Sequence, residues 1–141
     1  MQGELSFGEV QGTAGQGMSV FMHYFNQHHN TDNSITTNYG IHRSLPTMDF
    51  SLKNNPHILI QIEDLEYRRA AICKENELNR FEKTGWFDPQ WKSKTGLNYR
   101  SFNDKDGKKF YYQFEPIKPN EDFSALSEKI VNDLQTITNT K

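Results

Sequence analysis

Residues 57–63 give the clearest strand pattern in the chain. In an extended segment, one face would carry Ile58, Ile60 and Ile62, and the opposite face would carry Leu59, Gln61 and Glu63. An alternation with a period of two residues is typical of a half-buried β-strand. A second strand is predicted over residues 110–114, after the turn-forming pair Asp106-Gly107.

The last part of the chain has the spacing of an amphipathic helix. Its apolar residues recur every three or four positions: Phe123, Leu126, Ile130, Leu134 and Ile137. This spacing makes one apolar stripe, which we expect to pack on the sheet. Asn120 is a suitable N-cap, and Glu121 and Asp122 would lie near the positive end of the helix dipole.

The N-terminal half has weaker patterns. Leu5, Phe7 and Val10 suggest an opening strand, which would end at a glycine-rich turn over residues 11–17. The aromatic and β-branched run over residues 19–25 predicts a second strand, although a run this short also allows a helix. Residues 26–40 are polar and rich in turn-forming residues, so they predict a loop.

Residues 64–83 allow two interpretations. One is a hairpin arm through residues 67–72, and the other is a helix that contains Leu65, Ile72, Leu78 and Phe81. The charged residues and the two adjacent alanines favour some helix, and residues 84–109 are predicted to be irregular. The sequence therefore predicts an α+β fold for residues 1–141, a single domain in which a C-terminal helix packs on a mixed or antiparallel sheet.

Length and composition restrict the kind of protein. A chain of 141 residues has room for one hydrophobic core. No apolar run could span a bilayer, and the first residues lack the pattern of a signal peptide, so we expect a cytoplasmic protein that does not bind a membrane. The single cysteine, Cys73, cannot form an internal disulfide, and its apolar neighbours predict a small buried hydrophobic residue.

Charge is distributed unevenly along the chain. The net charge is −2, but residues 90–109 have a net charge of +4. The basic residues of this segment are Lys92, Lys94, Arg100, Lys105, Lys108 and Lys109, and aromatic residues lie within or beside it, including Trp86, Trp91 and Tyr99. Cations bind phosphates and flat rings stack on bases, so the mixture is typical of a surface that binds nucleic acid. The alternative is a solvated loop whose aromatic residues point into the core.

Other catalytic or metal-binding patterns are weak. The five histidines form no His-x-x-x-His pair, and with one cysteine no zinc-site spacing exists, so we expect no metal and no cofactor. Asp49 and the strand that follows it resemble the metal-binding hairpin of PD-(D/E)XK nucleases. Gln61 and Glu63 stand where that motif has its second acid and its lysine. The segment is therefore either a degenerate nuclease hairpin or the solvent-facing side of an ordinary strand.

Several short motifs, taken in order, resemble the N-terminal DNA-binding domain of McrB-type restriction proteins, which recognise modified cytosine. The matching motifs span nearly the whole chain: Leu5-Ser6-Phe7-Gly8, the aromatic run Val20–Phe25, Asn55-Pro56-His57-Ile58-Leu59, Gly107 followed by Phe110-Tyr111-Tyr112, and Asp122-Phe123 through Asp133. The resemblance implies a non-catalytic domain that flips a modified base into an aromatic pocket. In the larger proteins of this family, such a domain precedes others.

The chain departs from that family at the implied pocket. Glu9 and Val20 stand where the family has aromatic residues, and of the pocket wall only Leu59 carries over. A rebuilt pocket would use Leu59 with Tyr24, Trp86 or Trp91.

The sequence thus predicts a DNA-binding recognition module of a restriction or defence system. Its expected partners are double-stranded DNA and a nuclease or motor domain or subunit, and we expect no catalytic residues in this chain. The alternatives are a protein-interaction or inhibitor domain, of immunity or anti-defence type, and the degenerate nuclease.

Overall fold

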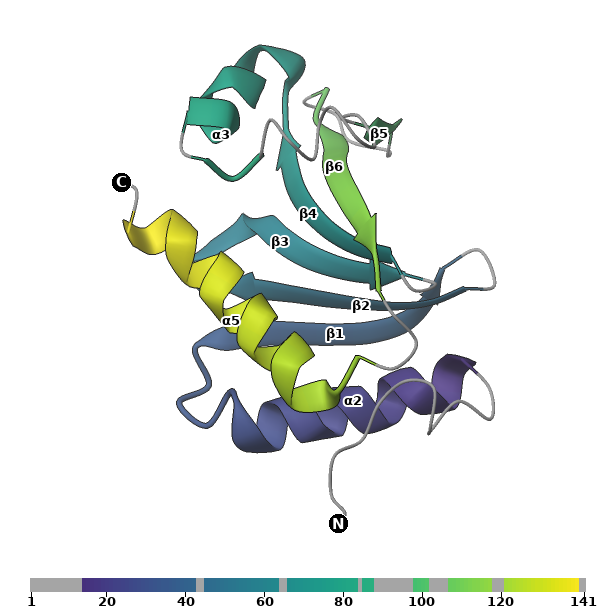
Figure 1. The fold of residues 1–141 in the computed structure, drawn as a ribbon. Helices are drawn as coiled ribbons and strands as arrows, with labels where there is room; N and C mark the ends of the chain where they lie inside the picture. The colour runs from purple at the N-terminus through teal and green to yellow at the C-terminus, as the bar shows by residue number, and fades with distance from the viewer. Residues whose placement is uncertain are drawn as a thin grey trace.

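A computed structural model of the chain describes residues 14–42, 45–63, 66–83, 85–87, 98–101, 107–117 and 121–139. Its centre is a six-stranded antiparallel sheet with the strand order β1-β2-β3-β4-β6-β5 (Figure 1). The strands are β1 (Ile35–His42), β2 (Leu45–Leu52), β3 (Asn55–Glu63), β4 (Glu66–Cys73), β5 (Asn98–Ser101) and β6 (Lys109–Pro116). The helices are α2 (Ala14–His28), the 3-10 turn η1 (Glu75–Glu77), α3 (Leu78–Lys83) and α5 (Phe123–Asn139). The predicted α+β fold is therefore confirmed.

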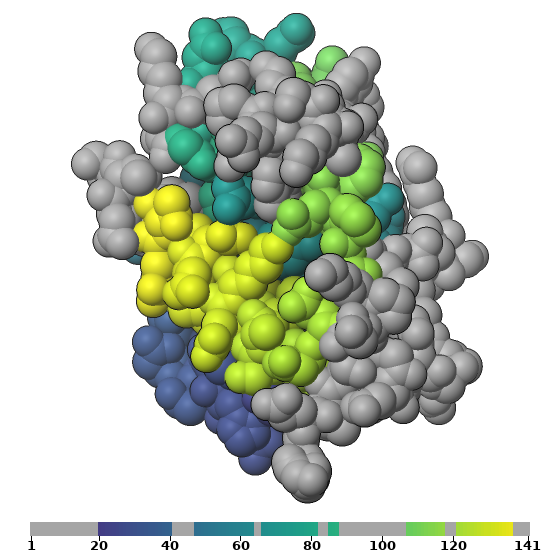
Figure 2. All heavy atoms as spheres, in the orientation of Figure 1, coloured from purple at the N-terminus to yellow at the C-terminus, as the bar shows by residue number. Residues whose placement is uncertain are grey.

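Helices α2 and α5 cover one face of the sheet, which we call the helix face. Figure 2 shows the atoms of α5 across the middle of this face, with those of α2 below. The buried ring of Phe21 from α2 lies 6.1 Å from the ring of Phe50 in β2 and 5.1 Å from that of Phe123 in α5. Phe25, one turn after Phe21, packs edge-on against Phe50 at 4.8 Å. Aromatic packing therefore fixes both helices on the same side of the sheet.

The strand predicted over residues 57–63 is confirmed as part of β3. Its three isoleucines are buried on the helix face, at Ile58, Ile60 and Ile62. Strand β3 pairs with β2 on one side and β4 on the other, so the residues between the isoleucines face away from the helices. The strand predicted over residues 110–114 is also confirmed, as part of β6.

The prediction for residues 19–25 was wrong, because they belong to helix α2 and not to a strand. Phe21 and Phe25 are four residues apart, which places both rings on one side of a helix, where the core buries them. The helix begins at Ala14, so the end of the expected glycine-rich turn is helical as well. The expected strand at Leu5–Val10 lies outside the described residues.

The loop predicted over residues 26–40 was wrong at both ends, because α2 continues to His28 and β1 begins at Ile35. This edge strand pairs along its whole length with β2. The Asn30 side chain accepts a hydrogen bond from the Ile35 backbone N–H at 3.1 Å and donates one to the Ile35 carbonyl at 2.9 Å. Asn30 thus occupies the start of the sheet edge, where another strand could otherwise pair.

Each of the two interpretations of residues 64–83 is correct for part of the segment. The predicted hairpin arm is strand β4. The predicted helix is present only after this strand, as the 3-10 turn η1 and the short helix α3. Residues 84–109, expected to be irregular, contain the short strand β5, which pairs with β6.

The predicted C-terminal helix is confirmed as α5. Four residues of its apolar stripe are buried against the sheet: Phe123, Leu126, Ile130 and Leu134. The Asp122 carboxylate accepts a hydrogen bond from the Ala125 backbone N–H at 2.6 Å, so Asp122 is the side chain seen to cap the helix. The expected cap Asn120 and the side chain of Ile137 lie outside the described residues.

Polar contacts also attach α5 to β4 and β6. The Asp133 carboxylate accepts a hydrogen bond from the Tyr67 hydroxyl at 2.5 Å and forms an ion pair with Arg69 at 3.0 Å. Lys129 pairs with Glu115 and lies over the Tyr67 ring, 4.6 Å from its centre. Burial and the nearby Asp133 carboxylate raise the pKa of Tyr67 well above its usual value.

No described helix has the length and apolar character needed to cross a membrane.

Candidate functional site

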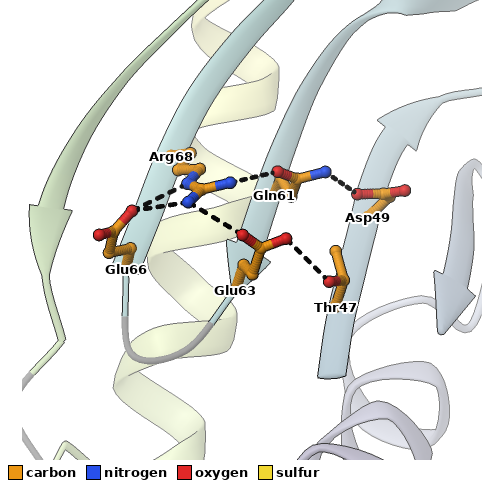
Figure 3. A network of polar contacts seen from close by, with 6 residues as sticks. All are labelled: Thr47, Asp49, Gln61, Glu63, Glu66 and Arg68. Atoms are coloured by element: carbon orange, nitrogen blue, oxygen red, sulfur yellow. Dashed lines mark hydrogen bonds and ion pairs between the residues drawn. The ribbon is translucent and has the colours of Figure 1, made fainter. Parts of the chain in front are cut away.

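The face of the sheet opposite the helices carries a network of polar side chains, which Figure 3 shows with α5 behind the strands. Its centre is Arg68 on β4, whose side chain is only 5% exposed. The guanidinium lies 3.2 Å from the Glu63 carboxylate and donates two hydrogen bonds to Glu66, at 2.7 and 3.1 Å. It also donates to the Gln61 side-chain oxygen at 2.8 Å. A buried guanidinium is tolerated only when its donors find such partners.

The network continues from β3 to β2. The Gln61 amide donates a hydrogen bond to the Asp49 carboxylate at 3.0 Å, and the Thr47 hydroxyl donates one to Glu63 at 3.1 Å. These contacts follow from the register, because Asp49 pairs with Gln61, Thr47 with Glu63, and Gln61 with Arg68. The side chains are therefore positioned by three adjacent strands rather than by loops.

This arrangement bears on the nuclease alternative. The sheet brings Asp49, Gln61 and Glu63 to one face: the alternation in the sequence predicts this for Gln61 and Glu63, and pairing of β2 with β3 adds Asp49. However, the cation held beside Glu63 is the guanidinium of Arg68. Within the described part of the chain, no three His, Cys, Asp or Glu residues are placed to hold a metal ion. The chemistry of the cluster is that of an ion-pair network, and it gives the nuclease alternative no support.

A row of aromatic rings lies beside the network on the same face. Phe110, Tyr112 and Phe114 occupy alternate positions of β6 and are all partly exposed. Their ring centres are 5.7 and 6.4 Å apart along the strand. The Arg68 guanidinium lies 4.6 Å from the centre of the Tyr112 ring, so the network and the row are in contact. We call these three residues the aromatic row.

Leu59 also lies on this face, where it pairs with Ala70 and is buried. Tyr24, one of the residues expected beside Leu59 in a base pocket, lies on α2 and therefore on the helix side of the sheet. Its ring is 5.7 Å from Phe123 and 4.7 Å from His28. The sheet separates Leu59 from Tyr24, so the fold does not bring them into one pocket.

Basic side chains gather where β4 ends and β6 begins. We call this group the basic end: Lys74, Arg80, Lys108 and Lys109. Cys73 pairs with Lys109, which brings Lys74 next to the start of β6, and Lys74 and Gly107 line the same shallow depression. Gly107 adopts a φ of 77°, a left-handed conformation that suits glycine. The Glu77 pKa is lowered, first by a hydrogen bond from the Lys74 backbone N–H and then by nearby cations, including Arg80 and Lys108.

Strand β5 adds to this end of the sheet. Its backbone pairs Arg100 with Phe110 and Ser101 with Lys109. Two predicted DNA-binding residues, Arg100 and Tyr99, therefore belong to the strand next to β6. The predicted Lys108 and Lys109 are half-buried at the start of β6. Four other predicted residues lie outside the described residues: Trp91, Lys92, Lys94 and Lys105.

Trp86 has a structural position in the core. Its side chain is 1% exposed, and its indole N–H donates a hydrogen bond to the Ala70 carbonyl at 3.0 Å. The Arg69 guanidinium lies 5.6 Å from the ring centre and donates a hydrogen bond to the Trp86 carbonyl at 3.3 Å. In this position the ring contacts the protein and not a ligand.

Sequence reasoning missed Arg68, Lys74 and Arg80. Arg68 becomes visible only if residues 66–73 are recognised as a strand, because its register then places it opposite Gln61. Lys74 and Arg80 are distant in sequence from residues 90–109, and only the pairing of β4 with β6 brings them close.

We compared the chain with protein-family models, with curated proteins and with solved structures, and none of the three comparisons gave a match. The resemblance to McrB-type domains therefore stays a prediction from the motifs alone.

Proposed function

We propose that this chain is a non-catalytic DNA-binding module, of the restriction or defence type suggested by its motifs, that contacts DNA with the basic end. The observation that supports this proposal is the convergence of cations from two segments that are distant in the sequence. Lys74 and Arg80 come from the region after β4, and Lys108 and Lys109 come from the turn before β6 and its first residue.

The charge balance makes this end distinct from the rest of the chain. The two segments that form it, residues 74–80 and 107–109, contain four basic and two acidic residues, Glu75 and Glu77. Their net charge is therefore positive, whereas the whole chain has a net charge of −2. A phosphate backbone is attracted to this positive end, so the field of the protein orients its approach to DNA. Contacts of this kind position a protein on DNA, and other groups must supply sequence preference.

Binding of a labelled duplex to the full chain, followed by fluorescence anisotropy at low salt, tests this proposal. We expect Lys108→Glu to weaken binding about tenfold, because a phosphate contact becomes a repulsion. The matched control is Lys53→Glu, which makes the same charge change at an exposed lysine in the turn between β2 and β3. The control should change affinity less than about twofold. Equal effects of the two substitutions, or no binding by the unchanged protein, would contradict the proposal.

Recognition of modified cytosine is the finer part of the proposal, and it is supported by the motif resemblance alone. Two duplexes that differ only in cytosine modification test it in the same assay. Tighter binding to one of them supports recognition of the modification. Equal binding leaves a DNA-binding module without that preference.

A protein-interaction domain is the second candidate, and two exposed apolar side chains favour it. Val20 and Tyr39 are large apolar side chains that are 39% and 41% exposed. Tyr39 lies on the edge strand β1, a position where proteins often bind partners. Binding to a protein partner at this surface should not depend on Lys108, and this independence separates the two candidates.

A further inference from the structure

We infer that the aromatic row is a stacking surface for the bases of an unpaired nucleic-acid strand, which the basic end holds by its phosphates. This inference rests on the proposed function and adds the class of ligand. A duplex would contact the basic end, whereas a single strand would contact both the basic end and the aromatic row.

The geometry of the row suits successive bases. Alternate residues of a strand project from the same face at intervals of about 6.6–6.8 Å. The ring centres of Phe110, Tyr112 and Phe114 are 5.7 and 6.4 Å apart, and the rings are tilted by 46° and 42° to one another. Pairing with β4 along the whole row, and with β5 at Phe110 and Tyr112, orders the backbone that carries the rings before a ligand arrives. Rings held in place in this way lose little conformational freedom on binding.

Charge gives the row a direction. Phe110 follows Lys108 and Lys109 directly and pairs with Arg100, so this end of the row lies at the basic end. Phe114 pairs with Arg68, whose charge is already engaged by Glu63 and Glu66. A polyanion is therefore attracted at Phe110 and meets carboxylates near Phe114. We expect the bases to stack mainly on Phe110, because the Arg68 guanidinium already lies over the Tyr112 ring.

An unpaired strand fits this surface better than a duplex. In a duplex each base stacks on its neighbours, and its flat faces are hidden from the protein. In an unpaired strand the faces are accessible, and every base has one, so stacking on aromatic side chains is tolerant of sequence. The row supplies rings, and the basic end supplies phosphate contacts within the same strand and the adjoining turn.

The test compares a labelled oligothymidine with a duplex of equal length, by fluorescence anisotropy with the full chain. We expect the single strand to bind more tightly, and Phe110→Leu to weaken its binding at least about fivefold with little effect on the duplex. Leucine keeps most of the buried apolar area but cannot stack, so the fold should be retained, and thermal unfolding by circular dichroism verifies this. Phe114→Leu should have a smaller effect, because Phe114 lies at the acidic side of the row.

Tyr39→Leu is the control for the loss of an aromatic residue elsewhere, since Tyr39 lies on β1, which three strands separate from β6. A similar loss from Tyr39→Leu and Phe110→Leu would overturn the inference. If the duplex binds but the single strand binds no more tightly and Phe110→Leu has no effect, the stacking surface is wrong and the proposed function stands. If neither ligand binds, both fail.

Discussion

Replacing Arg68 by methionine should destabilise the protein more than any exposed substitution, because Arg68 is the cation of the buried network. Methionine keeps the length of the side chain but leaves Glu63, whose side chain is 3% exposed, without the guanidinium at 3.2 Å. The hydrogen bonds to Gln61 and Glu66 and the contact with the Tyr112 ring are lost as well. Removing one partner of a buried ion pair costs about 3–5 kcal/mol. That is a large part of the roughly 5–15 kcal/mol by which a domain is stable.

Urea unfolding followed by tryptophan fluorescence, to which the buried Trp86 contributes, measures this change. Glu63→Gln provides the decisive control in combination with Arg68→Met. Once both charges are absent, the double variant should recover about 1–3 kcal/mol relative to the sum of the single changes. The account of the network would be refuted if Arg68→Met cost less than about 1 kcal/mol, or if the two substitutions were additive.

Four further predictions concern the rest of the fold. Asp133→Asn should lower the free energy of unfolding by about 1.5–3 kcal/mol, because it weakens the hydrogen bond from Tyr67 and the ion pair with Arg69. Urea unfolding measures this loss, and an unchanged free energy would contradict the role of Asp133. Asp122→Ala should cost about 1 kcal/mol through loss of the cap, whereas an unchanged thermal midpoint would show another cap. Burial raises the pKa of Cys73 to about 11, while an unfolded thiol ionises near about 8.5. The folded chain therefore retains the proton over this interval, and stability should fall as pH rises from about 8.5 to 11. In the folded protein at pH 8, Cys73 should also resist a disulfide reagent until urea is added, and rapid labelling would contradict its burial.

The parts of the fold that could be predicted are those with a strong local pattern. The isoleucine alternation of β3 and the apolar stripe of α5 each mark one buried face. Each element was therefore identified from the period of its own apolar residues. Helix α2 was misassigned because its apolar run is short, and Phe21 and Phe25 fit a strand or a helix equally well. Strand β1 was missed because its threonine and asparagine residues resemble a loop, and pairing with β2 decides its structure.

The candidate site was predictable only where one strand defines it. Alternation alone places Gln61 and Glu63 on the same face, and pairing with β2 adds Asp49. Arg68 depends on whether residues 66–73 form a strand, which composition did not decide. The basic end depends on the pairing of β4 with β6, two strands separated by more than thirty residues in the sequence. Such nonlocal pairing leaves no periodic signal in the chain.

The salt dependence of duplex binding tests the proposed function most directly. If the basic end contacts DNA phosphates, the logarithm of the association constant should fall with the logarithm of the salt concentration, with a slope of about −3 to −5. Changing Lys108 and Lys109 together to glutamate should make this slope shallower by about 2. A slope near zero, or one that the double substitution leaves unchanged, would contradict a phosphate-binding role for this end of the sheet.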